Sequence, residues 1–261
     1  MVYRGNNTQM RQIIAVLNQK GGVGKTTTAI NLGAYLAKSG KTVLIVDFDP
    51  QGNATSGLGV DKHSLDATIY EVLFKKAGAD HAIKETSVEN LYVLPANPQL
   101  AAAEVELVGE MQRELMLKEV LAPLSYDVVI IDCPPSLGLL TVNALTAAQH
   151  LLIPVQAEYY ALEGLSQLLS VVQRVRAGLN PQLDLLGVVV TMYDSRTSLS
   201  DQVHQELIKH FGDKVLDTVI PRNVRLAEAP SHGKPIADHD KWSKGARAYK
   251  ALSKEILKRI G

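Results

Sequence analysis

The sequence predicts a doubly wound α/β fold, with a mostly parallel sheet and helices on both of its faces. Stretches rich in Val, Ile and Leu recur along the 261 residues and are continuously apolar, which is typical of parallel strands covered on both sides. The predicted strands are residues 12–18, 42–47, 91–94, 127–132, 150–155, 185–192 and 215–220. A chain of this length with 46% hydrophobic residues can bury one large core. We therefore expect a single domain over residues 11–261, preceded by a loose polar tail, residues 1–10.

Helical periodicity marks several segments between the strands. Residues 28–39 form the first predicted helix, which is closed by Gly40. Residues 99–121, rich in Ala, Glu, Leu and Met, predict a longer helical segment, and residues 245–260 predict the last one. The last helix has an apolar face formed by Ala248, Leu252, Ile256 and Leu257. A further apolar stripe consists of Leu162, Leu165, Leu169, Val172 and Val175. Alternating strands and helices indicate a doubly wound sheet, in which ligands bind at the carboxyl ends of the strands.

A glycine-rich run follows the first predicted strand and opens the first helix: Lys20-Gly21-Gly22-Val23-Gly24-Lys25-Thr26-Thr27. Strand, glycine-rich turn and helix form the context of a phosphate-binding loop. Glycines let the backbone N–H groups point at an anion, and the helix N-terminus adds partial positive charge. Lys25 is expected to reach the β- and γ-phosphates, and the Thr26 hydroxyl to ligate Mg²⁺. Residues 20–27 are therefore predicted to bind a nucleoside triphosphate.

The loop departs from the common pattern G-x-x-x-x-G-K-[ST] at its first position. The first glycine would stand at position 19, where the chain has Gln19, and a second lysine, Lys20, follows it. The run instead resembles the deviant Walker A family, K-G-G-x-G-K-[ST]. That resemblance implies that Lys20 crosses a dimer interface to the partner's nucleotide and acts in catalysis with Lys25. A solvated loop lysine is the alternative, and it fits poorly beside the complete motif.

Two aspartates, Asp47 and Asp49, stand where the second predicted strand ends. Residues two apart on an extended backbone project to the same side, so both carboxylates could order Mg²⁺ or an attacking water. The run from Asp47 to Asn53, D-F-D-P-Q-G-N, resembles the first switch region of the ParA/Soj partitioning ATPases. By that resemblance, Asp49 positions the hydrolytic water. An aspartate that only caps a turn before Pro50 is the alternative, which the neighbouring phosphate loop disfavours.

Asp132 ends the strand 127–132 after four apolar residues. This is the Walker B form, whose carboxylate holds Mg²⁺, often through water. Many buried strands end in Asp, so the pattern alone is a weak signal. Together with the phosphate loop it is a strong one. The predicted metal ligands are Thr26, Asp47 and Asp132. The next residues, Cys133-Pro134-Pro135, resemble the second switch of the same family, and we expect Cys133 to be a small packed residue.

The segment 218–231 closely resembles the C-terminal region of ParA/Soj proteins. By that resemblance, Pro221 and Asn223 lie near the adenine. The predicted DNA contacts are Arg196, Arg222, Arg225, Lys241, Lys244 and Arg247. The planar fork of arginine suits phosphate oxygens, although an ordinary solvated charge explains any single one of these residues nearly as well. No segment resembles a base-reading helix, so DNA binding should be independent of sequence and sensitive to salt.

Composition excludes several classes of protein. Lys+Arg and Asp+Glu are equal at 27 each, so net charge does not indicate a nucleic-acid partner, although residues 191–261 carry a net charge of +4. The single cysteine, Cys133, excludes a disulfide framework or a cysteine-rich metal site and suits a reducing cytoplasm. The seven histidines are scattered without metal-ligand spacing. Tyr159 and Tyr160 are expected to be packing or interface residues, and no stretch has the ~20 apolar residues of a membrane span.

The resemblance extends from Gln12 to the last helix through four motifs, and the chain is identified as a member of the ParA/Soj type of partitioning ATPase. It implies ATP and Mg²⁺ as cofactors and an ATP-dependent homodimer that binds duplex DNA nonspecifically. Slow hydrolysis, accelerated by a ParB/Spo0J-type partner, would then release the DNA. The expected location is the bacterial cytoplasm, on the nucleoid, with no membrane partner.

Other members of the wider family remain as alternatives. A MinD-like positioning ATPase would need a terminal amphipathic helix, whereas here the apolar face of the last helix is expected to serve the fold. A dethiobiotin-synthetase-like ligase would need a small-molecule pocket, for which we find no residues. Nitrogenase-reductase-like and iron–sulfur-carrier relatives need cysteines that this chain lacks. Plasmid proteins with an N-terminal helix-turn-helix have about a domain's length before the loop, against 19 residues here.

Overall fold

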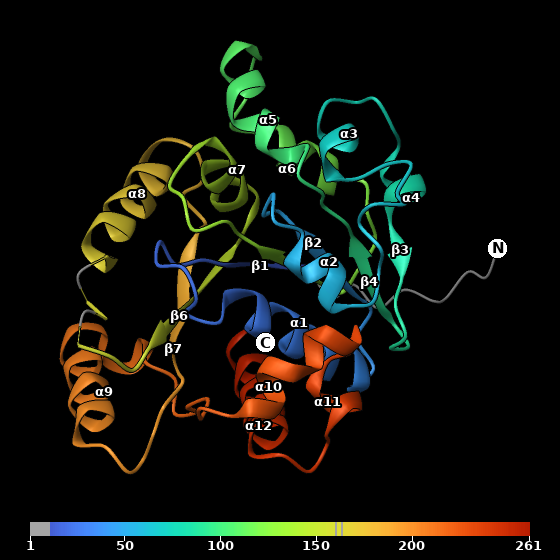
Figure 1. Cartoon of the computed structure of the whole chain (residues 1–261). Helices are drawn as coiled ribbons and strands as arrows, with labels where there is room; N and C mark the ends of the chain where they lie inside the picture. The colour runs from blue at the N-terminus through green and yellow to red at the C-terminus, as the bar shows by residue number, and fades with distance from the viewer. Residues whose placement is uncertain (1–10, 160, 163) are drawn as a thin grey trace.

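The computed structural model describes residues 11–159, 161–162 and 164–261, which contain a seven-stranded sheet (Figure 1). The strand order is β3-β4-β2-β5-β1-β6-β7, and all neighbours are parallel except β3 and β4. The strands are β1 (Gln12–Val16), β2 (Val43–Asp47), β3 (Lys84–Glu85), β4 (Leu91–Leu94), β5 (Val128–Asp132), β6 (His150–Gln156) and β7 (Asp184–Thr191). The predicted doubly wound fold is confirmed. The predicted tail, residues 1–10, lies outside the described residues, as does Tyr160.

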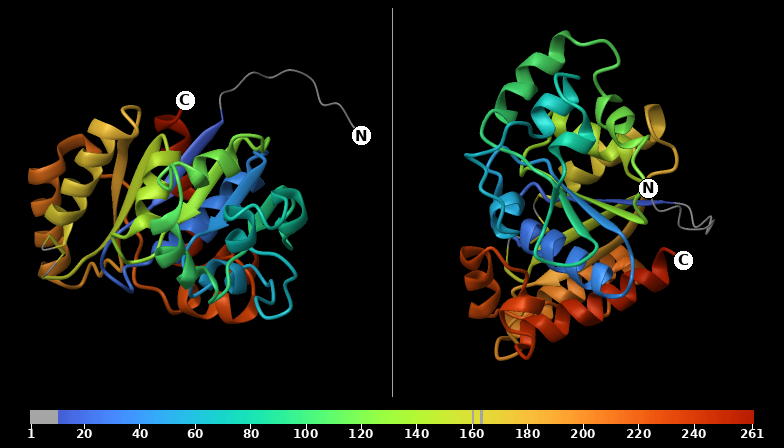
Figure 2. Two further views of the ribbon diagram at one scale, coloured as in Figure 1. Left: turned by 90° about the horizontal axis from the view of Figure 1, so that it is seen from above. Right: turned by 90° about the vertical axis from the view of Figure 1, so that its right-hand side faces the viewer.

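Helices cover both faces of this sheet (Figure 2). One face packs against α1 and the C-terminal helices α10 to α12, and the other against helices between α3 and α9. The helices are α1 (Lys25–Lys38), α2 (Asn53–Gly57), α3 (Ile69–Leu73), α4 (Ala79–Ala82), α5 (Leu100–Glu106), η1 (Leu107–Gly109), α6 (Met116–Leu121), α7 (Leu139–Ala147), α8 (Leu165–Gly178), α9 (Ser198–Phe211), η2 (Gly212–Lys214), α10 (Val224–Glu228), η3 (Ala229–His232), α11 (Ile236–His239) and α12 (Lys244–Arg259). Within the described residues, each helix is too short or too polar to cross a bilayer.

The prediction of a strand over 215–220 is wrong. This segment makes only isolated bridges to β7 and its neighbourhood, at Val215 and just beyond it at Pro221. Two of its backbone N–H groups, those of Asp217 and Thr218, donate instead to the Glu255 carboxylate, at 2.8 and 3.0 Å. Because α12 supplies this acceptor, these donors are not available for a continuous ladder.

The predicted helical segment 99–121 is interrupted. It forms α5, the short 3-10 helix η1 and α6, with an irregular stretch between residues 109 and 116. Gln112 adopts a left-handed conformation with φ 53°, which no continuous α-helix allows. The antiparallel edge strand β3 was not predicted, because its two residues, Lys84 and Glu85, are polar.

The last helix is joined firmly to the helix that follows the phosphate loop. The buried Thr28 and Tyr249 hydroxyls lie 3.1 Å apart in a hydrogen bond between α1 and α12. Leu252 and Ile256 of α12 are fully buried in the same core. The expectation that the apolar face of this helix serves the fold is confirmed.

Candidate functional site

The phosphate loop connects β1 to α1 at the carboxyl edge of the sheet. Gly22 and Gly24 have φ angles of 74° and 86°, in the left-handed region that glycine adopts without strain. Neighbouring strands hold the loop in place. The Thr191 hydroxyl, at the end of β7, donates to the Val23 carbonyl at 2.8 Å, and the Asn18 amide donates to a β6 carbonyl at 2.7 Å. The loop shape is thus fixed by the fold before any ligand arrives.

A cavity of about 290 Å³ lies over this loop. It is lined by Gly21, Gly22, Gly24, Lys25, Thr26, Thr27, Asp49, Gln51, Asn53, Pro135 and Met192. The structure therefore brings most of the predicted phosphate-loop residues together with Asp49. Lys20 and Val23 do not line the cavity, and the backbone of Val23 serves instead as the anchor point for Thr191. Sequence reasoning assigned no role to Gln51, Asn53, Pro135 or Met192, which stand just beyond strand ends or in the switch-like segments.

Lys25 is buried beneath the cavity, and its ammonium donates to the Lys20 carbonyl at 3.0 Å. Burial lowers the pKa of Lys25, while the carboxylates of Asp132 and Asp49 act in the opposite direction. Lys25 thus lines the phosphate cavity within the electrostatic reach of two carboxylates.

Two aspartates meet behind the loop, since Asp47 and Asp132 are paired residues at the ends of β2 and β5. Asp47 accepts hydrogen bonds from the backbone and hydroxyl of Thr55, at 2.7 and 2.6 Å. Neither carboxylate oxygen of Asp132 has a hydrogen-bond partner of standard geometry among the described residues, and both are buried. Burial raises the pKa of Asp132 well above its usual range, the Asp47 charge raises it further, and the nearby Thr26 hydroxyl opposes both.

These observations fit a divalent cation. Unpartnered carboxylate oxygens in a buried, acidic site lack the positive charge that a cation supplies. Asp132 and Thr26 are suitably placed to bind Mg²⁺, whereas Thr55 already occupies one oxygen of Asp47. The described residues form no cluster of three or more His, Cys, Asp or Glu ligands. This suits Mg²⁺, which takes one or two carboxylates and completes its shell with phosphates and water.

A second cavity, of about 310 Å³, adjoins the first and shares Gly24, Thr27 and Met192 with it. Its walls are mostly apolar and include the two residues that were expected near the adenine, Pro221 and Asn223. The Asn223 side-chain oxygen is buried and has no hydrogen-bond partner among the described residues. An apolar slot with one unpaired acceptor is suited to a flat heteroaromatic base that carries a donor.

Lys20 lies at the mouth of the loop and turns away from the phosphate cavity. Its ammonium forms an ion pair with Glu158, which follows β6, and 42% of the Lys20 side chain is exposed. Solvent-exposed pairs of this kind contribute little to stability. The Lys20 side chain can therefore exchange this partner for another anion at small cost.

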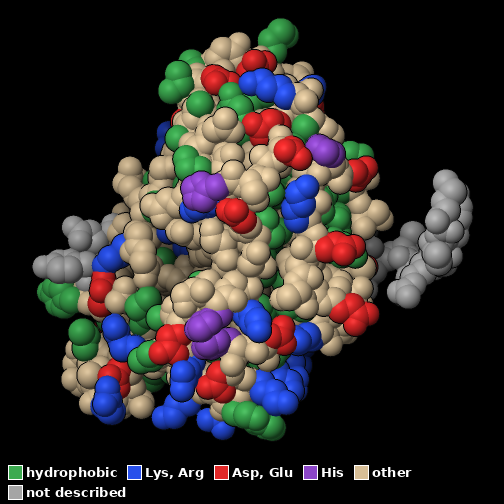
Figure 3. Space-filling view, turned by 45° about the vertical axis from the view of Figure 1, so that its right-hand side comes forward, with side chains coloured by type: hydrophobic (Ala, Val, Ile, Leu, Met, Phe, Trp, Pro, Cys, Tyr) green, Lys and Arg blue, Asp and Glu red, His purple; other side chains and the backbone are tan. Residues whose placement is uncertain are grey.

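The predicted DNA contacts lie on two neighbouring segments. Arg196 follows β7, and the Tyr193–Pro221 bridge brings its loop beside Arg222. The other four lie between α10 and the start of α12: Arg225, Lys241, Lys244 and Arg247. All six are exposed, and Figure 3 shows Lys and Arg side chains gathered at the bottom of the molecule, over the C-terminal helices.

Carboxylates are interspersed among these cations. Arg196 binds Asp194 with two hydrogen bonds, of 2.9 and 2.7 Å, and thereby holds the pKa of Asp194 well below its usual range. Arg225 pairs with Glu228 at 2.9 Å. The Lys241 ammonium lies 5.2 Å from the ring centre of Trp242, whose side chain is 79% exposed. The surface is therefore mixed in charge, with its basic character concentrated at the beginning of α12.

Comparison with known proteins places this geometry in a family. A family model described as an AAA domain matches residues 11–185. The chain is 59% identical to the sporulation initiation inhibitor protein Soj of Bacillus subtilis, over 95% of this chain and 98% of that protein. It is 56% identical to the chromosome-partitioning ATPase Soj of Thermus thermophilus, over 95% and 96%. The chain belongs to the Soj/ParA family of chromosome-partitioning ATPases.

Solved structures with bound nucleotide share this fold. A cobyrinic acid a,c-diamide synthase from Mycobacterium smegmatis, with bound ADP and magnesium, is 41% identical and has a TM-score of 0.85, over 95% of both chains. The septum site-determining protein MinD of Pyrococcus horikoshii, complexed with Mg-ADP, is 28% identical with a TM-score of 0.77, over 97% and 98%. The AAA-domain match ends before Pro221, whereas the two Soj relatives align over 95% of the chain.

Cys133 is buried at the end of β5, and burial raises the pKa of its thiol well above the usual range. This confirms the expectation that it is a packed residue. Tyr159 is 79% exposed, so it is not part of the core.

Proposed function

We propose that this chain is a partitioning ATPase that hydrolyses ATP slowly and binds duplex DNA nonspecifically as an ATP-dependent homodimer. A ParB/Spo0J-type protein would accelerate hydrolysis and so release the DNA. The proposed location is the bacterial cytoplasm, on the nucleoid. The observation that carries the proposal is a pair of adjoining cavities, one over a phosphate loop and one apolar, beside a lysine that points away from both.

The first cavity contains the groups that phosphoryl transfer requires. Lys25 and the loop N–H groups would hold the triphosphate, and Asp132 and Thr26 would hold Mg²⁺. When bound, Mg²⁺ neutralises charge on the phosphates. Asp49 accepts from the Gln51 N–H at 2.9 Å, which fixes its carboxylate at the cavity wall. A carboxylate has lone pairs for further donors, so Asp49 can also orient an attacking water.

The second cavity would select the base. Replacing Asn223 with alanine should lower the preference for ATP over GTP about tenfold, because adenine presents an amine donor where guanine presents a carbonyl acceptor. Competition between unlabelled nucleotides and a fluorescent ATP analogue would measure this preference. Asn53→Ala is the matched control, since Asn53 lines the phosphate cavity and should affect both nucleotides alike. An unchanged preference in Asn223→Ala would contradict the assignment.

Dimerisation would make DNA binding conditional on the nucleotide. In the monomer, the carboxylates Asp194, Glu228 and Asp240 partly neutralise the basic surface, so one copy should bind DNA weakly. Joining two copies doubles the phosphate contacts and raises the affinity through avidity.

We expect binding to a random-sequence duplex only with ATP, and not with ADP or without nucleotide. The affinity should fall steeply as salt rises, because each phosphate contact releases counterions. The chain's one tryptophan, Trp242, stands beside Lys241 in the basic surface, so its fluorescence provides a direct readout. Replacing Lys244 or Arg247 with alanine should reduce the logarithmic salt slope by about one.

Arg176→Ala provides the control for this experiment, because Arg176 is exposed on α8, outside the basic surface. Equal binding in all nucleotide states would exclude the switch. No binding in any state would exclude DNA as the partner, and binding to anionic vesicles would then favour the MinD-like alternative. Against that alternative stands the buried apolar face of α12, which packs in the core beside α1.

A further inference from the structure

The segment formed by α5 and η1 projects at the top of the molecule and carries exposed apolar side chains (Figure 1). Val105, Val108 and Met111 are 76%, 60% and 89% exposed. Val105 lies on α5 and Val108 on η1, and Met111 follows two residues after η1 ends. We call these three residues the α5 patch. Single exposed apolar residues are common, but three within seven residues of one projecting segment are typical of an interaction site.

Acidic residues surround the α5 patch. The segment 100–116 contains four glutamates and one arginine, which gives a net charge of −3. The arginine, Arg113, is itself paired with Glu114 at 3.0 Å. Figure 3 shows hydrophobic side chains at the top of the molecule with acidic side chains close to them. A partner for this surface therefore needs apolar side chains flanked by Lys or Arg.

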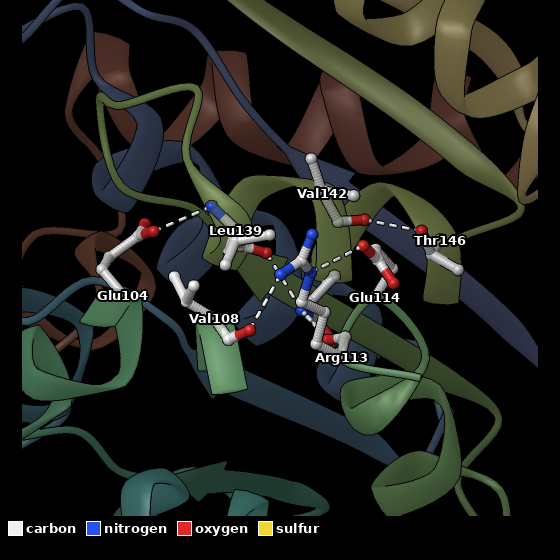
Figure 4. Close-up of polar contacts among 8 residues, drawn as sticks. Glu104, Val108, Arg113, Glu114, Leu139, Val142 and Thr146 are labelled. Atoms are coloured by element: carbon white, nitrogen blue, oxygen red, sulfur yellow. Dashed lines mark hydrogen bonds and ion pairs between the residues drawn. The ribbon is translucent and has the colours of Figure 1, made fainter. Parts of the chain in front are cut away.

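The segment that carries the patch is fastened to the helix that follows the second switch (Figure 4). The Glu104 carboxylate accepts from the Leu139 and Leu140 N–H groups at 2.8 and 3.3 Å, which caps the start of α7. A Cβ atom on Gly138 would lie 2.5 Å from this carboxylate, so the two segments are in close contact. Only three residues separate Pro135, in the wall of the phosphate cavity, from the start of α7 at Leu139.

A second connection holds the far end of the same segment. Asn143 of α7 donates to the Arg113 carbonyl at 2.7 Å and accepts from the Leu117 N–H at 3.1 Å. Arg113 in turn donates to the Val108 carbonyl at 2.9 Å. A ligand on the α5 patch would therefore act on a segment that is hydrogen-bonded at both ends to α7.

We propose that the α5 patch is the docking site for a basic amphipathic segment of the protein that accelerates ATP hydrolysis. This rests on the proposed function, because it supposes such an activating partner. The patch supplies apolar contacts, the glutamates supply selection for positive charge, and Glu104 transmits docking to the segment that ends the phosphate cavity. A helix presenting apolar residues every three or four positions, with Lys or Arg beside them, fits this surface.

The test compares three variants of the full chain with the wild type: Val108→Ser with Met111→Ser, Glu110→Lys, and a control. The control is Leu199→Ser with Ile208→Ser, which removes two exposed apolar side chains from α9, each 39% exposed. ATP turnover is measured with duplex DNA and increasing amounts of the ParB-type protein from the same genome. Thermal unfolding confirms that each variant folds.

The patch double variant should need at least about ten times more partner for half-maximal stimulation, since a few central residues carry most of the binding energy. Its basal turnover, ATP-dependent dimer and DNA binding should match the wild type. Glu110→Lys should also weaken stimulation, and more so at low salt than at high salt. The control variant should behave as the wild type does.

Three outcomes would overturn the assignment. Undiminished stimulation of the double variant would show that the partner docks elsewhere. Loss of the ATP-dependent dimer in that variant would show that the patch contacts a second copy of this chain. If the wild type is not stimulated at all, the activating partner of the proposed function fails, and this docking site fails with it.

Discussion

Replacing Lys20 with alanine should abolish the ATP-dependent dimer while leaving ATP binding by the monomer nearly unchanged. Lys20 does not line the phosphate cavity of its own subunit, so its loss removes little from the monomer's site. Across a dimer interface the same ammonium would face the partner's phosphates, and truncating one member of a buried charge pair costs about 2–5 kcal/mol. Light scattering with ATP should then give the monomer mass of 28.3 kDa instead of twice that value.

Two further variants make this experiment specific. Glu158→Ala removes the residue that holds Lys20 within the monomer, so dimerisation should occur at a lower protein concentration than in the wild type. Lys209→Ala removes another exposed lysine that is engaged in an ion pair, with Glu206 on α9, and should have no effect. A stable dimer of Lys20→Ala would refute the cross-subunit role.

Asp49→Ala should lower ATP turnover by about 10²- to 10³-fold, the range that a positioned acid or base contributes. ATP binding and dimerisation should persist, because the lysines and the loop are intact, and the variant should therefore stay on DNA. Phosphate release in single-turnover conditions measures the chemical step. The lifetime of the DNA complex measures how long the variant stays on DNA. Rapid turnover by this variant would rule out a role for Asp49 in hydrolysis.

A second substitution separates the role of Asp49 in the local turn from its proposed role in hydrolysis. Asp49→Asn retains an oxygen that can accept from the Gln51 N–H but lacks the carboxylate charge, so it should be as inactive as Asp49→Ala while keeping the local turn. Asp61 is the matched control, since it accepts from the His63 N–H in the same kind of turn on the exposed surface. Asp61→Ala should leave turnover within about twofold of wild type, since it removes only a surface contact.

The parts of the fold that could be predicted depend on local signals. Buried parallel strands such as β2 and β5 are continuous apolar runs, and the phosphate loop is one short motif with its own strand and helix. The mistaken strand over 215–220 is apolar at its ends, but the N–H groups of its two central residues bind Glu255, 38 and 37 residues away. A local pattern contains no information about such a distant acceptor.

In the candidate site, too, local motifs predict some residues, and contacts between distant segments determine the others. Lys25, Thr26 and Asp49 could be placed from the motifs, whereas the cavity wall formed by Met192 depends on how β7 ends beside the loop. The pairing of Lys20 with Glu158 joins residues far apart in the chain, and no sequence pattern marks it. The same holds for the unpaired oxygen of Asn223, which becomes meaningful only once the apolar walls around it are known.

Thr28 and Tyr249 join the helix behind the phosphates to the helix that carries Lys244 and Arg247, through a hydrogen bond that is buried on both sides. With the apolar contacts around it, this bond connects the phosphate loop to the basic surface through one packed core. Because close-packed cores resist deformation, we expect a bound nucleotide to leave the tilt and shape of that surface unchanged. In the proposed dimer, the nucleotide would instead change how many copies of this surface bind DNA together.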